Sequence, residues 1–563
     1  MSKCWIWFFL VLSYQSFADC LPAASFRFDT EKNTDISKDI AKVISDANAN
    51  HIQLYFGPGH FKFIRSVELK SDDCLKTIDI SGSGNGKTII EGWVYSKALN
   101  EIYSSVIKVD NLDYFPEYYR PPLKKAPVSL NFISSTGFFY PHALSGDDFL
   151  HVSKVGNDKI GSYVVFHKFY PEATGKIGNI FIHGFFGNQW RDEYIKVSQI
   201  VGDKFYLKRN PHYGLKSAAR VKLVEFPSGG WSDHLRNGEI NTKAIVANGF
   251  FQFKDLNSVS ISDLSFVGTN GNALHFYNID KLNIRNLNIS HVALDAIKAE
   301  KSKYGFIARN RIHTVGGSGI DVESGDRIQL KGYGFLIADN EISRVGEIYK
   351  TANPAIRING VGVDVKKNFI SDVPHSAIMF QGNDHFIGSN VIEKAVQSTG
   401  DAGVIYTGRD WAGQGTRIIE NKIKDSRGVA PYFATAIYID DQASGITAER
   451  NLIDNVYRAF LIGGGRSNML LGNKAYNCKE GIHADDRGLT WQKSRTQDSS
   501  WDLMRRLLSV PYQSEAYRKY KKLYELLDDE LGAPKYNTIQ DNDLLCERPF
   551  MFYGSFSRYV ELR

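Results

Sequence analysis

Two pairs of adjacent aspartates in the second half of the chain have the residue type needed for acid–base chemistry. Asp440 and Asp441 end the phrase Ala-Ile-Tyr-Ile-Asp-Asp, and Asp485 and Asp486 end the similar phrase Gly-Ile-His-Ala-Asp-Asp. Two carboxyl groups that flank a glycosidic bond can cleave it as acid and base, with inversion at separations of about 6.5–9.5 Å and retention at about 5–5.5 Å. The second aspartate of each pair could raise the pKa of the first through its charge, or could simply cap a turn.

Other polar and aromatic side chains in nearby segments could bind a sugar. Arg409 could pair with a carboxylate through two hydrogen bonds, and Trp411 could stack on a sugar ring. Glycines 463–465 would let a ligand approach the backbone beside Arg466. A lone histidine such as His375 is more often structural, so both roles stay open for it. The predicted substrate-binding residues are Arg409, Asp410, Trp411, Asp401, Tyr438, His483, Arg466, His375 and Gln381.

A recurring phrase, Asn-x-Ile, predicts the scaffold that positions these residues. Its asparagines recur every 22 to 31 residues, at Asn310, Asn340, Asn368, Asn390, Asn421, Asn451 and, with Ala in place of Ile, Asn473. A unit of this length cannot bury its own apolar face and must stack on copies of itself. We therefore predict an all-β fold, a parallel β-helix. The asparagines would lie at turns and form side-chain hydrogen-bond ladders between coils.

A second phrase in each repeat, small-Ile-x-apolar-x, predicts which side chains face outward. Alternate residues of a strand face opposite sides, so positions two and four point into the coil and positions three and five point out. The third positions are His275, Lys298, Asp321, Arg357, Met379, Ile405, Tyr438, Leu461 and His483. The fifth positions are Tyr277, Glu300, Glu323, Asn359, Gln381, Thr407, Asp440, Gly463 and Asp485. Such a polar, acidic and aromatic track suits an extended polymer, although an ordinary solvated face is the simpler reading.

Asp440 and Asp485 occupy the same column of this track, two coils apart, with Gly463 between them. Two coils separate the backbones by roughly 9–10 Å. The glycine would leave a notch between the two carboxyl groups, where a glycosidic bond could lie. This spacing favours the inverting mechanism.

The rest of the chain divides into segments of different character. Residues 1–18 have the positive start, short apolar stretch and small residues of a secretory signal, with cleavage after Ala18, so we expect an exported protein. Residues 19–130 are predicted to start the β-helix and residues 131–245 to form an inserted antiparallel β subdomain. The main β-helix would span 246–490. Helices in 491–563 would cap the open end of the stack.

Charge, hydropathy and cysteine content narrow the classes of partner. The net charge is only +6, without a dense basic block, so nucleic acid is not an expected partner. No run after the signal is long and apolar enough to insert into a membrane. Export permits disulfides between Cys20, Cys74, Cys478 and Cys546. Pairing by proximity would join Cys20 to Cys74 and Cys478 to Cys546, one of three possible patterns.

The motifs between residues 401 and 488 resemble those of a known group. Asp-Ala-Gly-Val-Ile-Tyr-Thr-Gly-Arg-Asp-Trp at 401–411, the two Asp-Asp phrases and Ile-Gly-Gly-Gly-Arg-Ser-Asn at 462–468 occur in that order. They resemble secreted bacterial right-handed parallel β-helix proteins of the pectate-lyase-like superfamily, closest to glycoside hydrolases of family 141. The resemblance implies hydrolysis of a polysaccharide, with Asp440 and Asp485, or Asp441 and Asp486, as the catalytic pair. It implies no cofactor.

Two other functions remain open at this point. A polysaccharide lyase needs an acidic sugar, a cation and a base. His275, Lys298 and Arg357 could serve it, with a Ca²⁺ ion at Asp321 and Glu323. A carbohydrate-binding protein without catalysis would use the same outward track. All three functions predict a polysaccharide or oligosaccharide partner.

Overall fold

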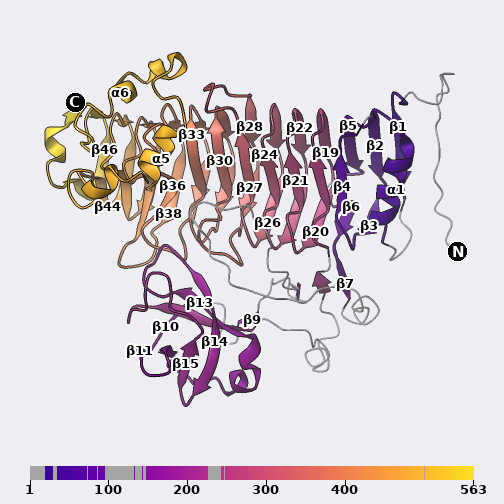
Figure 1. The fold of residues 1–563 in the computed structure, drawn as a ribbon, viewed down its shortest axis with the longest axis horizontal. Helices are drawn as coiled ribbons and strands as arrows, with labels where there is room; N and C mark the ends of the chain where they lie inside the picture. Colours follow the sequence, from indigo (N-terminus) through magenta and orange to yellow (C-terminus); the bar gives the residue numbers. More distant parts are fainter. Residues whose placement is uncertain are drawn as a thin grey trace.

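The computed structural model describes residues 20–29, 35–72, 74–84, 86–95, 132–133, 142–143, 148–225, 243–245, 247–499 and 501–563. These residues form a long parallel β-helix with an antiparallel subdomain beside it (Figure 1). The predicted secretory signal and its cleavage point after Ala18 lie outside the described residues. No helix among the described residues is long and apolar enough to cross a membrane.

Each coil of the β-helix contributes three strands, and each strand pairs in parallel with its counterpart in the next coil. The first strands form one continuous sheet, in the order β1 (Ala24–Phe28), β2 (His51–Phe56), β5 (Thr77–Gly82), β19 (Ser258–Ser262), β22 (Lys281–Arg285), β25 (Gly305–Ala308), β28 (Phe335–Ala338), β31 (Val363–Lys366), β34 (Phe386–Gly388), β37 (Arg417–Ile419), β40 (Thr447–Glu449), β43 (Met469–Leu471), β45 (Asn537–Gln540) and β47 (Val560–Leu562).

The second and third strands form the other walls of the coil. The second strands are β3 (Gly59–Lys62), β6 (Thr88–Glu91), β20 (Ser265–Thr269), β23 (Asn288–Val292), β26 (Arg311–Val315), β29 (Glu341–Ser343), β32 (Phe369–Ser371), β35 (Val391–Glu393), β38 (Lys422–Ser426) and β41 (Leu452–Val456). The third strands are β4 (Val67–Lys70), β18 (Phe251–Lys254), β21 (Leu274–Tyr277), β24 (Ile297–Glu300), β27 (Ile320–Ser324), β30 (Ile356–Val361), β33 (Ile378–Asn383), β36 (Ala402–Gly408), β39 (Ala434–Asp440) and β42 (Arg458–Gly463). The long strand β44 (Lys474–Asp485) pairs with both a second strand, β41, and a third strand, β42, and β46 (Asp543–Phe552) pairs along β44.

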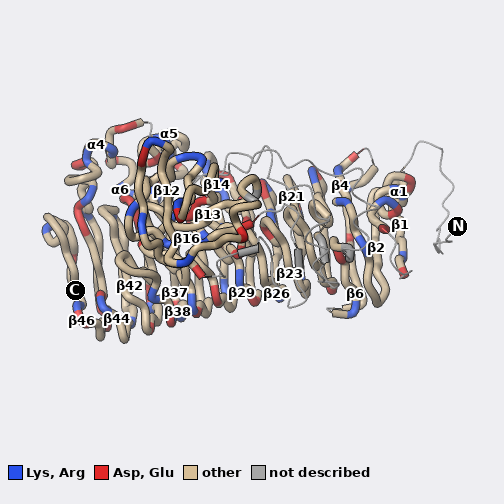
Figure 2. Tube along the Cα trace, turned by 90° about the horizontal axis from the view of Figure 1, so that it is seen from below, with Lys and Arg blue, Asp and Glu red and all other residues tan. Residues whose placement is uncertain are grey.

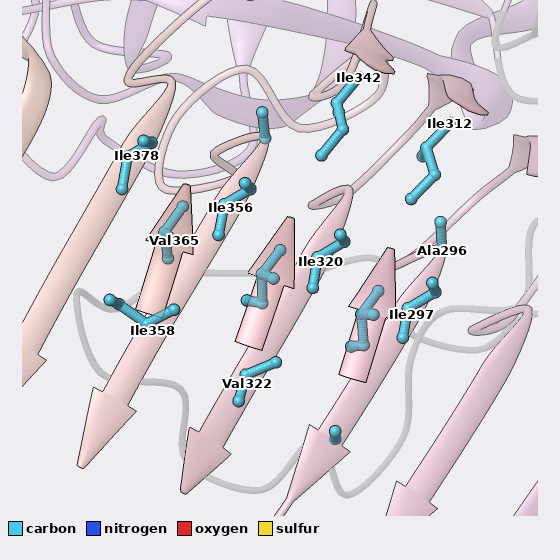
Figure 3. Close-up of a cluster of buried hydrophobic side chains, with 14 of the residues drawn as sticks. Ala296, Ile297, Ile312, Ile320, Val322, Ile342, Ile356, Ile358, Val365 and Ile378 are labelled. Carbon is cyan, nitrogen blue, oxygen red and sulfur yellow. The ribbon is translucent and has the colours of Figure 1, made fainter. Parts of the chain in front are cut away.

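Stacked aliphatic side chains fill the coil. Ile297, Ile320, Ile356 and Ile378 are partners in successive third strands, and all are fully buried (Figure 3). Their alternation with outward polar residues is the period of two that the second phrase predicted. Burying such a side chain stabilises the fold by about 1.5–3 kcal/mol, and the stack repeats this contribution coil after coil.

The predicted asparagine ladder is confirmed. The side-chain amide of each asparagine donates to the side-chain oxygen of the next, from Asn310 to Asn340 at 2.9 Å and onward through Asn368, Asn390, Asn421, Asn451, Asn473 and Asn542. Each of these side-chain oxygens also accepts a backbone N–H, so the buried amides leave few polar groups unsatisfied.

The predicted register is wrong at one coil. Ile405, expected to face outward, pairs with Ile378 and Ile437 and lies in the core. Tyr406 takes the third position beside Met379 and Tyr438, and Gly408 instead of Thr407 pairs with Asp440. A slip of one residue moves every side chain to the other face. It arises because the phrase aligns the small residue Gly403 with Ala436, whereas Gly403 pairs with Thr435, one residue earlier.

The inserted subdomain is antiparallel, as predicted. Its main sheet runs β10 (Leu150–His151), β16 (Arg220–Glu225), β13 (Ile180–Phe185), β14 (Glu193–Val201), β15 (Lys204–Leu207), β12 (Ser162–Val165) and β11 (Lys154–Asn157), with β9 (His142–Ala143) on β16. A 3-10 helix, η3 (Pro171–Asn179), completes it. Strands β7 (Trp93–Tyr95), β17 (Lys243–Ile245) and β8 (Phe132–Ile133) form a small sheet where the chain leaves and rejoins the β-helix.

The two ends of the stack are finished differently. At the N-terminal end, helix α1 (Ser37–Ala47) buries Ile40 and Ile44 in the core of the first coils. At the C-terminal end, β45 and β46 belong to the last complete coil, and β47, after η5 (Phe556–Arg558), pairs with β45 at the edge of the first-strand sheet. The predicted disulfides Cys20–Cys74 and Cys478–Cys546 are both present, one near each end.

The C-terminal helices do not cap the open end, which corrects the prediction. Helices α4 (Lys493–Thr496), α5 (Asp502–Leu508), η4 (Glu515–Lys519) and α6 (Lys521–Tyr524) lie along the flank of the stack (Figure 1). Leu503, Leu507 and Tyr517 pack there around Trp411, far from β47 in the sheet order. The prediction of helices in this segment is confirmed. They lie beside the stack because the chain adds one more coil after them.

Acidic and basic residues alternate along the coils on the side shown in Figure 2, without a large block of either sign. This distribution follows from the near balance of 68 basic and 62 acidic residues. Local chemistry on this scaffold therefore depends on which charges are close together.

Candidate active site

Asp440 and Asp485 lie in one column on the outward side of the third strands, which we call the third-strand face. Gly408 pairs with Asp440, and Gly463 pairs with Asp485. β42 separates β39 from β44, so the two aspartates are two coils apart, as predicted. Both side chains are mostly covered, with 14% and 15% of their surface exposed. They face the same side of the molecule because they occupy the same strand position.

Arg487 fills the space above Gly463, so the predicted notch is not empty. A Cβ on Gly463 would lie 2.6 Å from the guanidinium carbon of Arg487. The guanidinium donates to Asp440 Oδ1 at 2.7 Å through one terminal nitrogen and to Asp485 Oδ2 at 2.7 Å through the other. Glycine is therefore required here to make room for a cation that joins the two carboxylates.

Tyr406 uses the second glycine of the column in a similar way. Its hydroxyl lies 3.0 Å from the position that a Cβ on Gly408 would take. From there it donates to Asp440 Oδ2 at 3.0 Å. Asp440 is thus held on one side by Tyr406 and on the other by Arg487, each passing over a glycine of a neighbouring coil. The sequence did not predict this role of Tyr406, because the predicted register at this coil is wrong by one residue.

The surroundings move the pKa values of Asp440 and Asp485 in opposite directions. Burial and the nearby charge of Asp441 raise the pKa of Asp440 to about 7, against the opposing effect of Arg487. Burial alone would also raise the pKa of Asp485, but hydrogen bonds from His483 and Arg487 outweigh it and lower this pKa to about 2. At neutral pH one group can donate a proton while the other remains a carboxylate.

The second aspartate of each pair is tied to the protein. Asp441 is buried and accepts hydrogen bonds from Arg409 at 2.7 Å, from Arg487 at 3.3 Å and from Gln492. Burial opposes its ionisation, but Arg409 and Arg487 lower its pKa. Asp486 is buried and accepts from the backbone and hydroxyl of Ser555, both at 2.6 Å. Their burial corrects the alternative in which Asp441 and Asp486 contact the substrate.

Further polar groups adjoin the pair on the third-strand face; Asp401 and His483 are partly exposed, and Tyr438 is buried. The Tyr438 hydroxyl donates to Asp401 Oδ1 at 3.1 Å, and burial raises the pKa of Asp401. His483 lies 3.8 Å from Asp485 Oδ2 and stacks near the ring of Tyr553. Asp401, Tyr438 and His483 therefore adjoin the pair as predicted.

Two further polar residues near His483 were missed. Arg458 donates to Glu480 at 2.6 Å, and Glu480 lies 3.7 Å from His483. Arg458 begins β42 and Glu480 is its partner in β44, and both precede the five residues of the recurring phrase.

Arg409 and Gln381 lie at the edges of this region. Arg409 is partly exposed, with its guanidinium 5.8 Å from the ring of Trp501 while it binds Asp441. Gln381 pairs with Asn359 in the same column, before Gly408. Both positions leave room for contact with a ligand on the third-strand face.

Four predicted binding residues are buried for structural reasons, which corrects their assignment. Trp411 is in the core that α5 and α6 form on the flank. Asp410 accepts the backbone N–H groups of Ala412 and Gly413 and pairs with Arg327. Arg466 binds Asp529 and the backbone carbonyls at 529, 530 and 533. His375 is 3% exposed, and burial lowers its pKa to about 4.

Two separate parts of the chain flank this section of the third-strand face. At the strand starts, the subdomain docks through Asp192 on Thr351, Gln189 on Gly400 and Arg220 on the Ser398 carbonyl. At the strand ends, the C-terminal segment docks through Arg506 on the Gly408 carbonyl, Tyr520 on Asp384 and Gln492 on Asp441. In Figure 1 these two parts lie on opposite sides of the stack. They account for the burial of the carboxyl groups between them.

Comparison with known proteins agrees with the architecture. The family model for the right-handed β-helix region matches residues 354–499, which contain β30 to β44 and both candidate aspartates. The protein is a right-handed parallel β-helix. No curated protein matches the sequence.

Several solved structures are similar to this chain at a low level. One titled as a glycoside hydrolase is 12% identical and has a TM-score of 0.43, with 79% of this chain and 92% of that chain covered. A complex of XylC with xylose is 10% identical, with a TM-score of 0.41 and coverage of 90% and 81%. The surface protein and adhesin PfbA of Streptococcus pneumoniae is 12% identical, with a TM-score of 0.39 and coverage of 81% and 91%. Similarity at this level assigns no activity to this chain.

Proposed function

We propose that this protein is a glycoside hydrolase that cleaves a polysaccharide on the third-strand face. Asp440 is the general acid and Asp485 the general base. The observation that carries this proposal is the pair itself: two carboxyl groups two coils apart, facing the same side, with pKa values of about 7 and about 2. A carboxyl group that is still partly protonated at neutral pH, near one that is ionised, supplies the acid and the base that glycosidic bond hydrolysis requires.

In this mechanism Asp440 gives its proton to the oxygen of the leaving sugar. Asp485 takes a proton from the attacking water, which bonds to the anomeric carbon as the glycosidic bond breaks. Both Asp485 oxygens accept hydrogen bonds from Arg487, but each carboxylate oxygen has a further lone pair for water. The separation of the two carboxyl groups, which decides between inversion and retention, is fixed by Arg487, whose two terminal nitrogens each bind one of them.

Arg487 positions the pair and is not itself an acid or base. It remains charged, since its carboxylate partners raise its pKa well above the usual value. Its charge keeps Asp485 ionised and fixes both carboxyl groups relative to each other. Asp401, Tyr438, His483, Arg409 and Gln381 would contact the sugars on either side.

The lyase alternative places its chemistry on other residues of the face. Its candidate cations are each paired with an acid: His275 and Lys298 with Glu300, and Arg357 with Asp321 at 3.4 Å. Asp321, half of the suggested Ca²⁺ site, thus faces a guanidinium. These pairs leave the lyase without a specific observation in its favour.

The test is a panel of neutral, uronate-containing and sulfated polysaccharides, with two readouts on each sample. New reducing ends without ultraviolet absorbance are the expected result, because hydrolysis creates no double bond. Reducing ends with absorbance would replace the hydrolase with the lyase. Glycan affinity without any product at any pH would replace both with a binding function.

We also propose that the protein is exported. The two disulfides support this, because such bonds persist in oxidising compartments. Fractionation of cells that express the full chain tests it: the mature protein is expected outside the cytoplasm with its N-terminus at Asp19. Retention of residues 1–18 in a cytoplasmic fraction would contradict it.

A further inference from the structure

A groove lies on the third-strand face at a distance from Asp440. It has a volume of about 440 Å³, and its lining includes Lys301, Lys303, Glu323, Arg327, Tyr333 and Asn359. Glu323 and Asn359 belong to the same column as Asp440. From β27 the pairing passes through β30, β33 and β36 to β39, which is four coils or roughly 19 Å. A single extended glycan chain could therefore touch both places.

Two tyrosines in and beside the groove are each held between lysines. The ammonium groups of Lys254 and Lys301 lie 5.5 and 5.2 Å from the ring centre of Tyr277. Those of Lys303 and Lys331 lie 5.8 and 6.0 Å from that of Tyr333. Aromatic rings offer flat surfaces to sugar rings, and the lysines place positive charge at their borders.

Most of these lysines have no carboxylate partner. Among the described residues, Lys254, Lys301 and Lys331 form no ion pair, whereas Lys303 binds Asp280 at 2.8 Å. Lys301 donates instead to the Tyr277 hydroxyl at 3.0 Å. Of the acids in the lining, Asp326 accepts the backbone N–H groups of Ile328 and Gln329 and so belongs to its own turn. Positive charge is thus left for a ligand.

Glu323 is the remaining acid in the lining. Burial and the charge of Glu300 raise its pKa, and it pairs with Asn359 in the column of the third-strand face. Among the described residues, the groove thus has lysines without a carboxylate partner, whereas Asp440, Asp441 and Asp485 share Arg487.

We propose that this groove is a distal subsite for a negatively charged sugar, carrying a carboxylate or a sulfate, in the glycan that Asp440 and Asp485 cleave. The assignment of that glycan rests on the proposed function. Lys301 and Lys331 bind the anionic group, and Tyr333 packs on the ring that carries it. The groove adjoins the C-terminal segment, because the Tyr517 hydroxyl donates to the carbonyl of the lining residue Arg327 at 2.6 Å, and it lies four coils from Asp440.

The test measures binding separately from turnover. Full-length protein with Asp440→Asn is titrated with oligogalacturonate, with a sulfated oligosaccharide and with a neutral xylo-oligosaccharide, at low and high salt. We expect one of the two anionic ligands to bind and to weaken with salt, and Lys301→Glu to reduce that affinity by roughly tenfold or more. The two anionic arms distinguish a uronate from a sulfate.

Lys422→Glu is the matched control, because Lys422 is exposed on a second strand away from the groove. It should leave the affinity unchanged. Lys331→Glu provides a second groove variant if Lys301→Glu fails to fold. Equal affinity for the neutral ligand, or full anionic affinity in a folded groove variant, would overturn the subsite. If the subsite binds but no glycan is hydrolysed, the proposed function fails and the subsite stands.

Discussion

The two halves of the third-strand face carry similar residues in the same register but differ in how the charges are shared. In β24 and β27 two acids have their own cations: Glu300 binds His275 and Lys298, and Asp321 binds Arg357. In β39 and β44, Asp440, Asp441 and Asp485 share Arg487. The hydrogen bond from His275 lowers the pKa of Glu300 to about 2, whereas burial raises that of Asp440 to about 7.

The difference comes from what covers the strands. The inserted subdomain and the C-terminal helices flank the second half, where the carboxylates that bind Arg487 are only 8–15% exposed. Glu300 and His275 are about twice as open, at 31% and 29%. Solvent screens charges in the open half, while in the covered half a carboxyl group with too few cations keeps its proton. A regular scaffold thus acquires chemistry where irregular segments dock on it.

The largest expected effect is the loss of turnover in Asp440→Asn and in Asp485→Asn. Each removes one proton-transfer group, which contributes about 10²–10⁴-fold to rate. Reducing-end release on the best substrate measures it, and circular dichroism checks the fold. Asp364→Asn is the control, an aspartate on the first-strand sheet with 42% of its side chain exposed. Full activity in both site variants would remove the acid–base assignment.

Gly463→Ala should reduce turnover by about 10²-fold while the chain still folds. The added methyl group would collide with the guanidinium of Arg487 and shift the carboxyl groups that it holds. The rate constant and the melting temperature are compared with those of Gly175→Ala, since a Cβ at Gly175 would meet nothing within 4 Å. An unchanged rate would mean that the position of Arg487 is not important for the reaction.

The pH dependence of activity should report on Asp440 in the covered half as clearly as mutation does. Activity requires protonated Asp440, so it should fall roughly tenfold per pH unit above about 7. Asp485, with its pKa at about 2, stays ionised between pH 4 and 7 and therefore does not limit the activity in this range. Initial rates from pH 4 to 9 measure the profile. A rate that rises through pH 7 would exclude Asp440 as the acid.

Asp192→Asn should detach the subdomain from the covered half. Asp192 is buried and accepts hydrogen bonds from the Thr351 backbone and from His183, the latter at 2.6 Å. Losing this acceptor should cost about 2–4 kcal/mol in the free energy of unfolding. Thermal melting measures the loss, and a melt that matches the parent protein would show that the docking does not depend on Asp192.

Acid should weaken the same contact without a mutation. Burial lowers the pKa of His183 to about 4, so its unfolded form binds a proton first as pH falls below 6.5. Hydrogen bonds from His183 and Thr351 outweigh burial and lower the pKa of Asp192 to about 2, so its contribution is lost below about pH 4. Stability should therefore decline from pH 6.5 downward.

The smallest effect is expected in the open half. Glu300→Gln removes a carboxylate that pairs with His275 and Lys298 on a partly exposed surface. Such pairs contribute about 0–1 kcal/mol, so the unfolding free energy should change by less than about 1 kcal/mol. Turnover of a short oligosaccharide should not change. A loss as large as that of Asp440→Asn would move the active site to this half.

The sequence predicted the features that depend on repetition. The asparagine ladder, the buried isoleucines and the shared column of Asp440 and Asp485 follow from phrases that recur in every coil. Repetition makes such features visible because each coil must match the next. The same reasoning failed at Ile405, because the phrase aligns Gly403 with Ala436, whereas Gly403 pairs with Thr435.

What could not be predicted depends on contacts between distant segments. Trp411 and Arg466 resemble surface residues in the sequence, but the C-terminal segment folds back over both of them. Arg487 directly follows an Asp-Asp pair and was missed, although Gly463 gave a signal: a position without a side chain between two acids needs a long cation from elsewhere. Local periodicity carries no information about which distant segment supplies that cation.

The β-helix continues across the inserted subdomain as though the chain were uninterrupted. β5 pairs with β19, and β6 with β20, so that Ile89 lies beside Ser265. During synthesis the first coils must wait with open edges until β19 and β20 emerge. The Cys20–Cys74 bond joins residues that are all made before this wait, and so it can hold the first coils together during it. The waiting itself costs little in equilibrium stability, because the entropy of closing a loop grows only with the logarithm of its length.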